Sequence, residues 1–405
     1  MSRGRTLRFA LILGGLSAFG PLSIDMYLPA FPSMAHEFQT GQSQVQLTLT
    51  AFMIGISTGQ VIAGSLSDAL GRRRPLLVGL VLYTVCSVAC AFAPTIYALA
   101  GLRLLQGFGA AAGVVIARAA VRDLYSGIEL ARFFSLLMLV NGLGPVLAPL
   151  IGGQLMRFTT WVGVFVVLTG CGLVLLLASA FGLPETLPDR LRGPVRLGYT
   201  VRVFGRLLVD KSFVGYALSA GLLFGAMFGY IAGSSFVLQG LFGLSPQAYS
   251  LVFGVNSVGI VAMGQANRLL LRRFDPRAIL GATLVVAAVG GLGVFVAVVA
   301  HLGLFGLLVP LFVTVASIGL VFPNSTALAL AEHPDTAGSA SALLGLLQFL
   351  IGGLVAPLVG IGGSALPMGL AIGALPLAAV LVFRFLTRPV ETAPQTSEDS
   401  SAPVN

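Results

Sequence analysis

Long apolar stretches, separated by short polar segments, recur along almost the whole chain. Each contains about 20 residues, the length that an α-helix needs to cross the roughly 30 Å hydrocarbon core of a membrane. Because lipid offers no partner for backbone hydrogen bonds and the alternating pattern of strands is missing, the stretches are predicted to be helices. Twelve spans are predicted, at residues 9–33, 45–66, 75–94, 96–117, 132–154, 161–183, 212–238, 248–270, 278–300, 303–329, 339–361 and 365–386.

A polar, proline-containing segment at residues 184–211 divides these spans into two groups of six. The expected fold is therefore an all-α membrane protein of twelve transmembrane helices, with pseudo-symmetric six-helix bundles at 1–183 and 212–388. The dividing segment is a cytoplasmic linker in which arginines alternate with apolar residues. An amphipathic helix on the membrane surface and a solvated basic segment both fit that pattern. The tail, 389–405, is rich in Pro, Ser, Thr and acids, which predicts disorder.

The composition agrees with a membrane protein, because 57% of the 405 residues are hydrophobic, 9% are charged and the mean hydropathy is +0.97. A net charge of +9 could by itself indicate a nucleic-acid partner. However, the Lys and Arg residues fall almost entirely in alternate loops and helix ends, with only Arg157 on the other side and Arg103 inside a span. This is the distribution of the positive-inside rule, which places both termini in the cytoplasm. We therefore expect no nucleic-acid partner.

Two residues of opposite charge lie inside the apolar spans, Asp25 in the first and Arg103 in the fourth. Arginine at the centre of a membrane helix costs about 2.5–3.5 kcal/mol on insertion scales, so it needs a partner or water. The first span runs outward and the fourth inward, and at 1.5 Å per residue both side chains lie roughly 10–12 Å from the outer ends. The matching depth predicts that Asp25 and Arg103 pair.

The loop after the second span carries the sequence Gly-Ser-Leu-Ser-Asp-Ala-Leu-Gly-Arg-Arg-Arg at residues 64–74. It resembles the signature loop of the major facilitator superfamily, except that Ala69 replaces a basic residue. A carboxylate at this position suits the positive N-terminus of a neighbouring helix, and arginines can pair with it. The resemblance implies that the loop packs against the start of the eleventh span, at residues 335–340. The residues expected to form this conformational gate are Gly64, Asp68, Gly71, Arg72, Arg73 and Arg74.

Further motifs resemble one subgroup of that superfamily. The fifth span contains two prolines among glycines, which are expected to bend the helix and bring it close to its neighbour. This run resembles the motif of the drug antiporters, and its expected positions are Gly144, Pro145, Pro149, Gly152 and Gly153. Four other strings resemble the bicyclomycin-resistance (Bcr/CflA) type: Ser-Ile-Asp-Met-Tyr-Leu-Pro from residue 23, Arg-Asp-Leu-Tyr from 122, Glu-Thr-Leu-Pro from 185 and Asp-Thr-Ala-Gly-Ser-Ala-Ser from 335.

The resemblance implies a proton-coupled multidrug antiporter of the bacterial inner membrane. Drugs are then exported by alternating access, in which the two bundles rock around a site near mid-membrane. In this interpretation Asp25 carries the proton and Arg103 is its partner, because a buried carboxylate beside a guanidinium is a group that a proton gradient can switch. The proton gradient is the energy source, so no cofactor is expected. The expected partners are small-molecule drugs, protons and membrane lipids, with the protein acting as a monomer.

Polar and aromatic residues within the spans are candidates for a substrate cavity. Buried amides can bind a substrate or bridge helices, and aromatic rings can stack on a flat drug or face lipid, so both interpretations stay open. The candidates are Tyr27, Asn141, Phe224, Phe228, Tyr230, Asn256, Asn324 and Gln348. The three cysteines and three histidines do not have the spacing of metal ligands, so no metal is expected.

Other functions fit parts of the pattern. A transporter of a small metabolite or amino acid has the same fold. A membrane enzyme needs clustered His, Asp or Glu at the interface, which the sequence does not offer. A non-transporting receptor usually carries a soluble output domain, and no segment of the sequence resembles one.

Overall fold

The computed structural model describes residues 3–125, 127–193, 197–333 and 336–387. Within these ranges all regular elements are helices, which confirms the predicted all-α class. The long helices are α4 (Gln42–Leu70), α5 (Arg73–Ala91), α6 (Ile96–Leu124), α7 (Gly127–Leu155), α8 (Trp161–Gly182), α10 (Lys211–Ser235), α11 (Pro246–Leu270), α12 (Pro276–Val299), α13 (Gly303–Ala331), α14 (Ala337–Leu358) and α15 (Leu366–Leu386). Short 3-10 turns lie at η2 (Asp189–Leu191) and η5 (Ile361–Gly363), and η3 (Phe236–Leu241) extends α10 as a π-helix.

The first predicted span is not one continuous helix. It is divided into α1 (Arg3–Ser17), α2 (Phe19–Asp25), η1 (Leu28–Ala30) and α3 (Phe31–Glu37), and its two main parts are bent by 42°. Proline lies in the first turn of both η1 and α3, where its missing N–H is tolerated and its fixed φ starts a new helical segment. The bend falls between Ser17 and Phe19, and a second interruption leaves residues 26 and 27 outside regular helix, directly after Asp25.

The other predicted spans coincide with helices. Ten described helices are long and apolar enough to cross a membrane, and the bent first segment makes an eleventh. The remaining predicted span, 132–154, lies inside α7, a helix of 29 residues that continues through Pro145 and Pro149. Three helices begin at an N-cap side chain: Asp210, Ser245 and Asp275 each accept hydrogen bonds from backbone N–H groups in the first turn.

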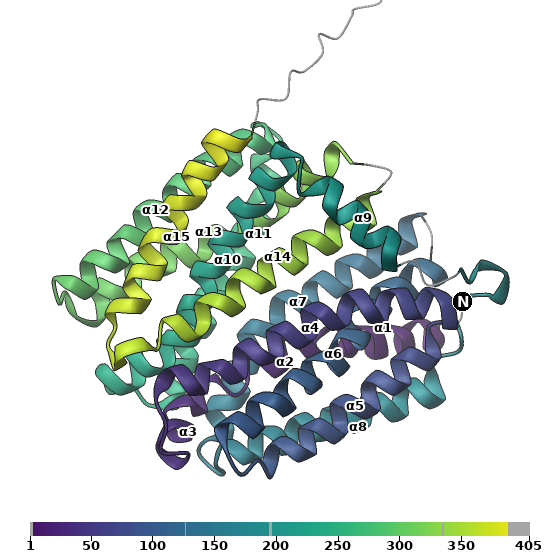
Figure 1. Ribbon diagram of the computed structural model, residues 1–405, viewed down its shortest axis with the longest axis horizontal. Helices are drawn as coiled ribbons and strands as arrows, with labels where there is room; N and C mark the ends of the chain where they lie inside the picture. Colours follow the sequence, from purple (N-terminus) through teal and green to yellow (C-terminus); the bar gives the residue numbers. More distant parts are fainter. Residues whose placement is uncertain (1–2, 126, 194–196, 334–335, 388–405) are drawn as a thin grey trace, which may run out of the picture.

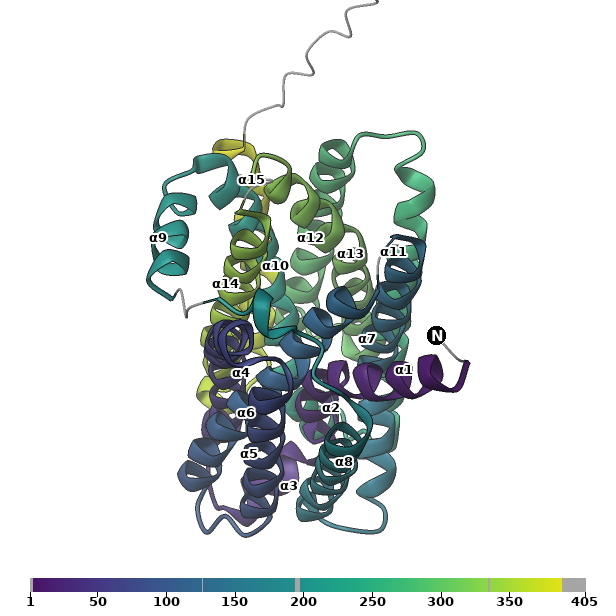
Figure 2. The same ribbon diagram turned by 90° about the vertical axis from the view of Figure 1, so that its right-hand side faces the viewer.

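The helices form two lobes that lie side by side (Figure 1). The first lobe contains α1–α8 and the second α10–α15; α4 packs on α14 and α7 packs on α11. A 90° turn shows the two contacts on opposite sides of the molecule (Figure 2). The linker contains α9 (Leu197–Leu207), whose Val203 and Leu207 are buried while Arg202 and Arg206 are exposed. This helix is amphipathic and packs against α14; its position on the membrane surface stays a prediction.

The two ends of the molecule differ in how the lobes meet. We call the end that carries residues 64–74 the loop end, and the other the far end. The hydrogen bonds between side chains of one lobe and backbone carbonyls of the other lie in the far-end half of the helices. They include Ser43 to Pro357 O (2.8 Å), Gln46 to Ala232 O (2.9 Å), Thr50 to Gly353 O (2.8 Å), Ser235 to Leu28 O (2.7 Å) and Gln247 to Gly153 O (2.7 Å). The far end is therefore closed.

Candidate functional site

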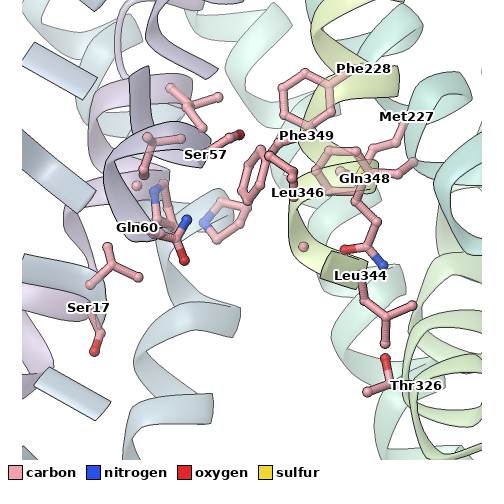
Figure 3. A pocket seen from close by; sticks show the side chains of 18 of the residues that line it. Ser17, Ser57, Gln60, Met227, Phe228, Thr326, Leu344, Leu346, Gln348 and Phe349 are labelled. Carbon is pink, nitrogen blue, oxygen red and sulfur yellow. The ribbon is translucent and has the colours of Figure 1, made fainter. Parts of the chain in front are cut away.

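A cavity of about 780 Å³ lies between the lobes and extends toward the loop end. Ser17, Ser57 and Gln60 of the first lobe face Phe228 and Phe349 of the second across it (Figure 3). Its lining continues to Arg122 near the end of α6 and to Gly338 near the start of α14. This size and mixed lining are typical of a small-molecule site.

Asp25 is the last residue of α2 and lies in the wall of this cavity. Its side chain is 4% exposed, and its Oδ1 atom has no hydrogen-bond partner among the described residues. Tyr230 and Asn256 of the second lobe line the same cavity. A buried carboxylate without a partner is costly, and inside a membrane such groups mark ion and substrate pathways.

Arg103 lies in a closed chamber inside the first lobe. Its side chain is fully buried. Its guanidinium donates hydrogen bonds to Gln106 Oε1 (2.6 Å) and to the carbonyl oxygen of Ser23 (2.7 Å). It also lies 4.4 Å from the ring centroid of Tyr27 and 4.3 Å from that of Phe52, and such contacts contribute about 0.5–2 kcal/mol each. The chamber therefore stabilises the charge without a carboxylate.

The pair predicted between Asp25 and Arg103 is not formed. Asp25 Oδ1 and Arg103 Nε each lack a partner among the described residues. The prediction matched the depths of the two residues but not their directions. At about 100° per residue, Ser23 and Tyr27 lie on one face of the first segment, and Asp25 lies on the opposite face. Arg103 binds the first face, so Asp25 is turned toward the cavity.

Five of the predicted cavity residues line the cavity: Phe224, Phe228, Tyr230, Asn256 and Gln348. Two others do not. Tyr27 contacts Arg103 and lies within hydrogen-bond distance of Thr48 (3.3 Å), and Asn324 donates a hydrogen bond to Asn267 (2.8 Å). The side chain of Asn141 lies outside the described part of the chain.

The glycine and proline motif of α7 packs between the broken first segment and α11. A Cβ atom on Gly152 would lie 1.9 Å from the carbonyl oxygen of Met26, so only glycine fits there. A Cβ atom would also lie too close to Pro21 if added to Gly144, and too close to Ser250 if added to Gly153. Pro149 is buried, and the carbonyl oxygen of Pro145 accepts a hydrogen bond from Ser257 of the second lobe (3.1 Å). The motif thus fixes the backbone next to Asp25.

The 64–74 loop is held by carboxylates of the first lobe. Gly71 has φ +85°, a conformation that favours glycine, and it turns the chain into α5. The Arg72 guanidinium binds Asp68 and Asp123, with 2.9 Å from its Nε to the second carboxylate. Asp123 belongs to the Arg-Asp-Leu-Tyr string, and Glu185 of the Glu-Thr-Leu-Pro string accepts the backbone N–H groups of Arg72 (2.8 Å) and of the next residue (3.2 Å).

These contacts change the acidity of both partners. Burial acts to lower the pKa of Arg72, but its hydrogen bonds to Asp123 and Asp68 outweigh burial and raise this pKa. Partial burial acts to raise the pKa of Glu185. Hydrogen bonds from three backbone N–H groups and the charge of Arg192 outweigh it, so the pKa of this carboxyl is lowered. Both shifts strengthen the charged forms that hold the loop.

No hydrogen bond or ion pair among the described residues joins this loop to residues 336–340, where docking was expected. Asp335 lies outside the described residues, and the described contacts of the loop go to Asp123, Glu185 and the segment around α8. Arg73 donates to the carbonyl oxygen of Ala180, and Arg74 is exposed. A Cβ atom on Gly64 would make an ordinary contact of 3.7 Å with Val115, so its lack of a side chain is not required here. At this end the cavity lies between the lobes, from Arg122 of the first to Gly338 of the second.

Some residues of the site were not singled out from the sequence. In the sequence Asp123 and Glu185 stand out only as parts of short strings, although the loop needs carboxylates for its three adjacent arginines. The charge pattern places Arg118 at a helix end, where it contributes to topology, but it lines the cavity. The signal that could have found it is the spacing of Val114, Arg118 and Arg122, which lie one turn apart on a single face.

Two helical lobes around a central cavity, with a buried acid in its wall, define a membrane transporter rather than an enzyme. The chain belongs to the Major Facilitator Superfamily, whose family model matches residues 13–357. The family that the sequence motifs resemble is thus confirmed.

Individual relatives extend this result. The chain is 41% identical over 389 residues to the uncharacterized MFS-type transporter YdgK of Bacillus subtilis, covering 94% of this chain and 96% of the relative. It is 31% identical over 384 residues to a bicyclomycin resistance protein homolog of Haemophilus influenzae, with 94% and 96% covered. Multidrug resistance protein MdtL of Salmonella paratyphi C is 27% identical over 379 residues, with 93% and 94% covered.

Solved structures show the same fold at low sequence identity. The nucleoside transporter NupG has a TM-score of 0.77 at 12% identity, covering 95% of this chain and 100% of that structure. A D-xylose-proton symporter has a TM-score of 0.74 at 16% identity, with 96% and 98% covered. The family match and the bacterial relatives make the chain a multi-pass bacterial membrane protein that moves small molecules.

Proposed function

We propose that this transporter is a proton-coupled antiporter that exports drugs across the bacterial inner membrane by alternating access. The observation that carries the proposal is Asp25, a buried carboxylate whose Oδ1 has no described partner and which lines the cavity between the lobes. The names of the bicyclomycin-resistance and multidrug-resistance relatives support a drug as the substrate.

The orientation follows from the basic residues. Arg72, Arg73 and Arg74, the basic linker and the start of α12 with Arg277 all lie at the loop end, which the positive-inside rule places in the cytoplasm. In this orientation both termini are cytoplasmic, the cavity extends toward the cytoplasm and the closed far end faces outward. A drug then enters from the cytoplasm.

Drug and proton compete for Asp25. The carboxylate binds a positive or hydrogen-bond-donating group of the drug while the lobes are closed at the far end. Rocking of the lobes breaks the cross-lobe hydrogen bonds there and closes the loop end. A proton from outside then neutralises Asp25, the drug leaves, and the protonated carrier returns to release its proton inside. Arg103 holds the Ser23 carbonyl two residues away, so it positions Asp25 through the backbone.

The test is an Asp25→Asn variant reconstituted in liposomes with an internal pH dye. The amide keeps the shape of the side chain but cannot carry a proton. Drug-driven proton movement should be abolished, while the variant elutes as a single species on size exclusion like the wild type. Asp25→Glu, which keeps a titratable group at a shifted position, should retain part of the coupling.

Full drug-driven proton movement by Asp25→Asn would refute the role of this residue. Export of a metabolite rather than a drug is the second candidate, because the cavity contains amides such as Asn256 and Gln348 that suit polar substrates. A substrate screen in inside-out vesicles separates the two. The proposal requires no cofactor, and one chain contains the whole cavity, so the transporter acts as a monomer.

A further inference from the structure

A second intramembrane arginine faces the cavity. Arg118 lines its wall from α6, six residues before the end of that helix and thus roughly 9 Å from it. Its side chain is exposed, and none of the hydrogen bonds or ion pairs among the described residues involves its guanidinium. Arginine inside a membrane normally pairs or faces a water-filled pathway. Here it faces the space in which a substrate is bound.

Arg118 and Asp25 lie at different depths of the same cavity. Gly113 of α6 lies beside Phe19 of α2, where a Cβ atom would contact the phenylalanine ring at 3.1 Å. From this level, Asp25 is six residues farther toward the far end and Arg118 five residues farther toward the loop end. At 1.5 Å per residue the two Cα atoms are roughly 15–20 Å apart along the axis. The arginine side chain leans toward the N-terminus of α6, which shortens the gap between the charges.

The charged residues in the lining are therefore separated by sign. Asp25 is the acid at the deep end, and Arg118 and Arg122 are the bases toward the loop end. The space between them is lined by apolar and aromatic side chains such as Val114, Leu344 and Phe349, together with uncharged polar side chains such as Ser57 and Gln60. The separation creates a cavity with a negative end, a positive end and an uncharged middle.

Resting on the proposed function, we infer that the cavity recognises elongated zwitterions, with an ammonium group at Asp25 and a carboxylate at Arg118. The ring system of such a molecule occupies the uncharged middle, where it can contact Phe349. This arrangement agrees with antiport, because the ammonium group competes with the proton at Asp25 while the carboxylate is held at a separate point. A guanidinium binds a carboxylate with two parallel hydrogen bonds, which an ammonium ion of lysine does not reproduce.

A purely topological role does not explain the position of Arg118. The cations that orient the protein lie in loops and at helix ends, as Arg72 and Arg272 do. Arg118 instead lies more than one turn inside α6 and lines the cavity. A charge at this place acts on whatever enters the cavity.

Binding of three related probes tests the inference. Norfloxacin has a piperazine ammonium and a carboxylate at opposite ends of a rigid, fluorescent ring system. Its methyl ester keeps only the positive charge, and its N-acetyl derivative keeps only the negative one. Dissociation constants are measured by fluorescence anisotropy on purified protein for the wild type, Arg118→Gln, Arg118→Lys, Asp25→Asn and Arg272→Gln.

The wild type should bind norfloxacin at least about tenfold more tightly than either derivative, as expected for one charge-assisted contact at each end. Arg118→Gln should weaken norfloxacin by about tenfold and change the methyl ester by less than about twofold, with Arg118→Lys in between. Asp25→Asn should give the opposite selectivity: it should weaken binding of the methyl ester but not of the N-acetyl derivative. Arg272→Gln removes one cation from an exposed site of the same end and should bind all three probes like the wild type.

Equal weakening of norfloxacin and its ester by Arg118→Gln overturns the inference, as does a wild type that does not prefer the zwitterion. The proposed function is judged separately. If Asp25→Asn still couples drug and proton movement, the antiport mechanism fails even when Arg118 selects the carboxylate. If the coupling requires Asp25 but the probes are not discriminated, only the zwitterion inference fails.

Discussion

The chamber of Arg103 and the wall at Asp25 are formed by the same short segment of chain, yet they treat charge in opposite ways. Ser23 and Tyr27 contact the Arg103 guanidinium inside the first lobe. Asp25, between them in sequence, faces the cavity with an unpartnered oxygen. Because residues two apart in a helix point to nearly opposite sides, one segment contributes to both environments.

The difference separates charges that hold the lobe together from charges that are left free to act. Arg103 is enclosed by hydrogen bonds and aromatic rings, so its removal leaves buried acceptors without donors. Asp25 loses little when its charge is removed, because it makes no hydrogen bond through Oδ1. Stability should therefore depend on the first residue and transport on the second.

The largest expected effect on stability comes from Arg103→Met. The change removes two hydrogen bonds from a charged donor and two close aromatic contacts, a loss of about 3 kcal/mol or more. The melting temperature of the purified protein should fall by about 5–10 °C. Asp25→Asn should melt at or above the wild-type temperature. Differential scanning fluorimetry on both variants measures the contrast.

The opposite order of the two melting temperatures would contradict the distinction between Arg103 and Asp25. If Arg103→Met melted like the wild type while Asp25→Asn were destabilised, the free carboxylate would be the structural group. Arg103→Lys sharpens the test, because it keeps the charge but cannot reach both Gln106 and the Ser23 carbonyl in the same fork geometry.

A smaller loss of stability is expected at the 64–74 loop, where Glu185 is one of the charges that stabilise the structure. Glu185→Gln weakens the hold on the N–H groups of Arg72 and Arg73, costing about 1 kcal/mol because the carboxylate is partly exposed. The pKa of Glu185 is lowered in the folded protein, so its contribution is full above the ordinary value of 4.5 and is lost as the pH falls through the lower folded value. Melting curves at pH 7 should separate wild type and variant by about 2 °C, and at acidic pH the curves should converge.

Asp189→Asn is the matched control, since its carboxylate is 86% exposed and pairs with Arg192. It should melt like the wild type at every pH. If the difference in melting temperature between wild type and Glu185→Gln grew as the pH fell, its sign would be wrong. Glu185 would then not be one of the charges that stabilise the lobe.

Periodicity and length were sufficient to predict the helices, because a lipid environment permits few alternatives for an apolar stretch of about 20 residues. They did not predict the break at residues 26 and 27, which depends on closely spaced prolines and on the docking of Gly152 against the Met26 carbonyl. The direction of Asp25 follows from its place in α2, where it lies about 200° around the helix from Ser23. Depth alone therefore paired it with Arg103, when direction required the opposite face.

The site was predictable in part for a related reason. Phe224, Tyr230 and Asn256 could be nominated as cavity residues because polar and aromatic groups within spans are unusual. Arg118 could not be separated from the cations that orient the protein, since its distance from the end of α6 depends on where that helix stops. The partners of Arg72 lie 51 and 113 residues away along the chain, which local patterns do not reveal.

The smallest expected effect concerns a bond that joins the lobes rather than a charge in either region. Thr50 donates a hydrogen bond to the Gly353 carbonyl across the closed far end. Thr50→Val keeps the shape of the side chain and removes about 0.5–1.5 kcal/mol of stabilisation from the closed far end, which lowers the ratio of far-end-closed to far-end-open molecules by roughly two- to twelvefold.

Thr58→Val is the control, because the described hydrogen bonds of Thr58 lie within α4, to the Ile54 carbonyl at 2.7 Å and more weakly to that of Gly55. Double electron–electron resonance distances between spin labels at Gln44 of the first lobe and Ile361 of the second, which line one pocket at the far end, measure the two populations. A shift to longer distances in Thr50→Val but not in Thr58→Val is expected. Equal distance distributions would mean that the far end stays closed without this bond. The charge of Asp25, rather than the hydrogen bonds across the far end, would then set the balance between the two states.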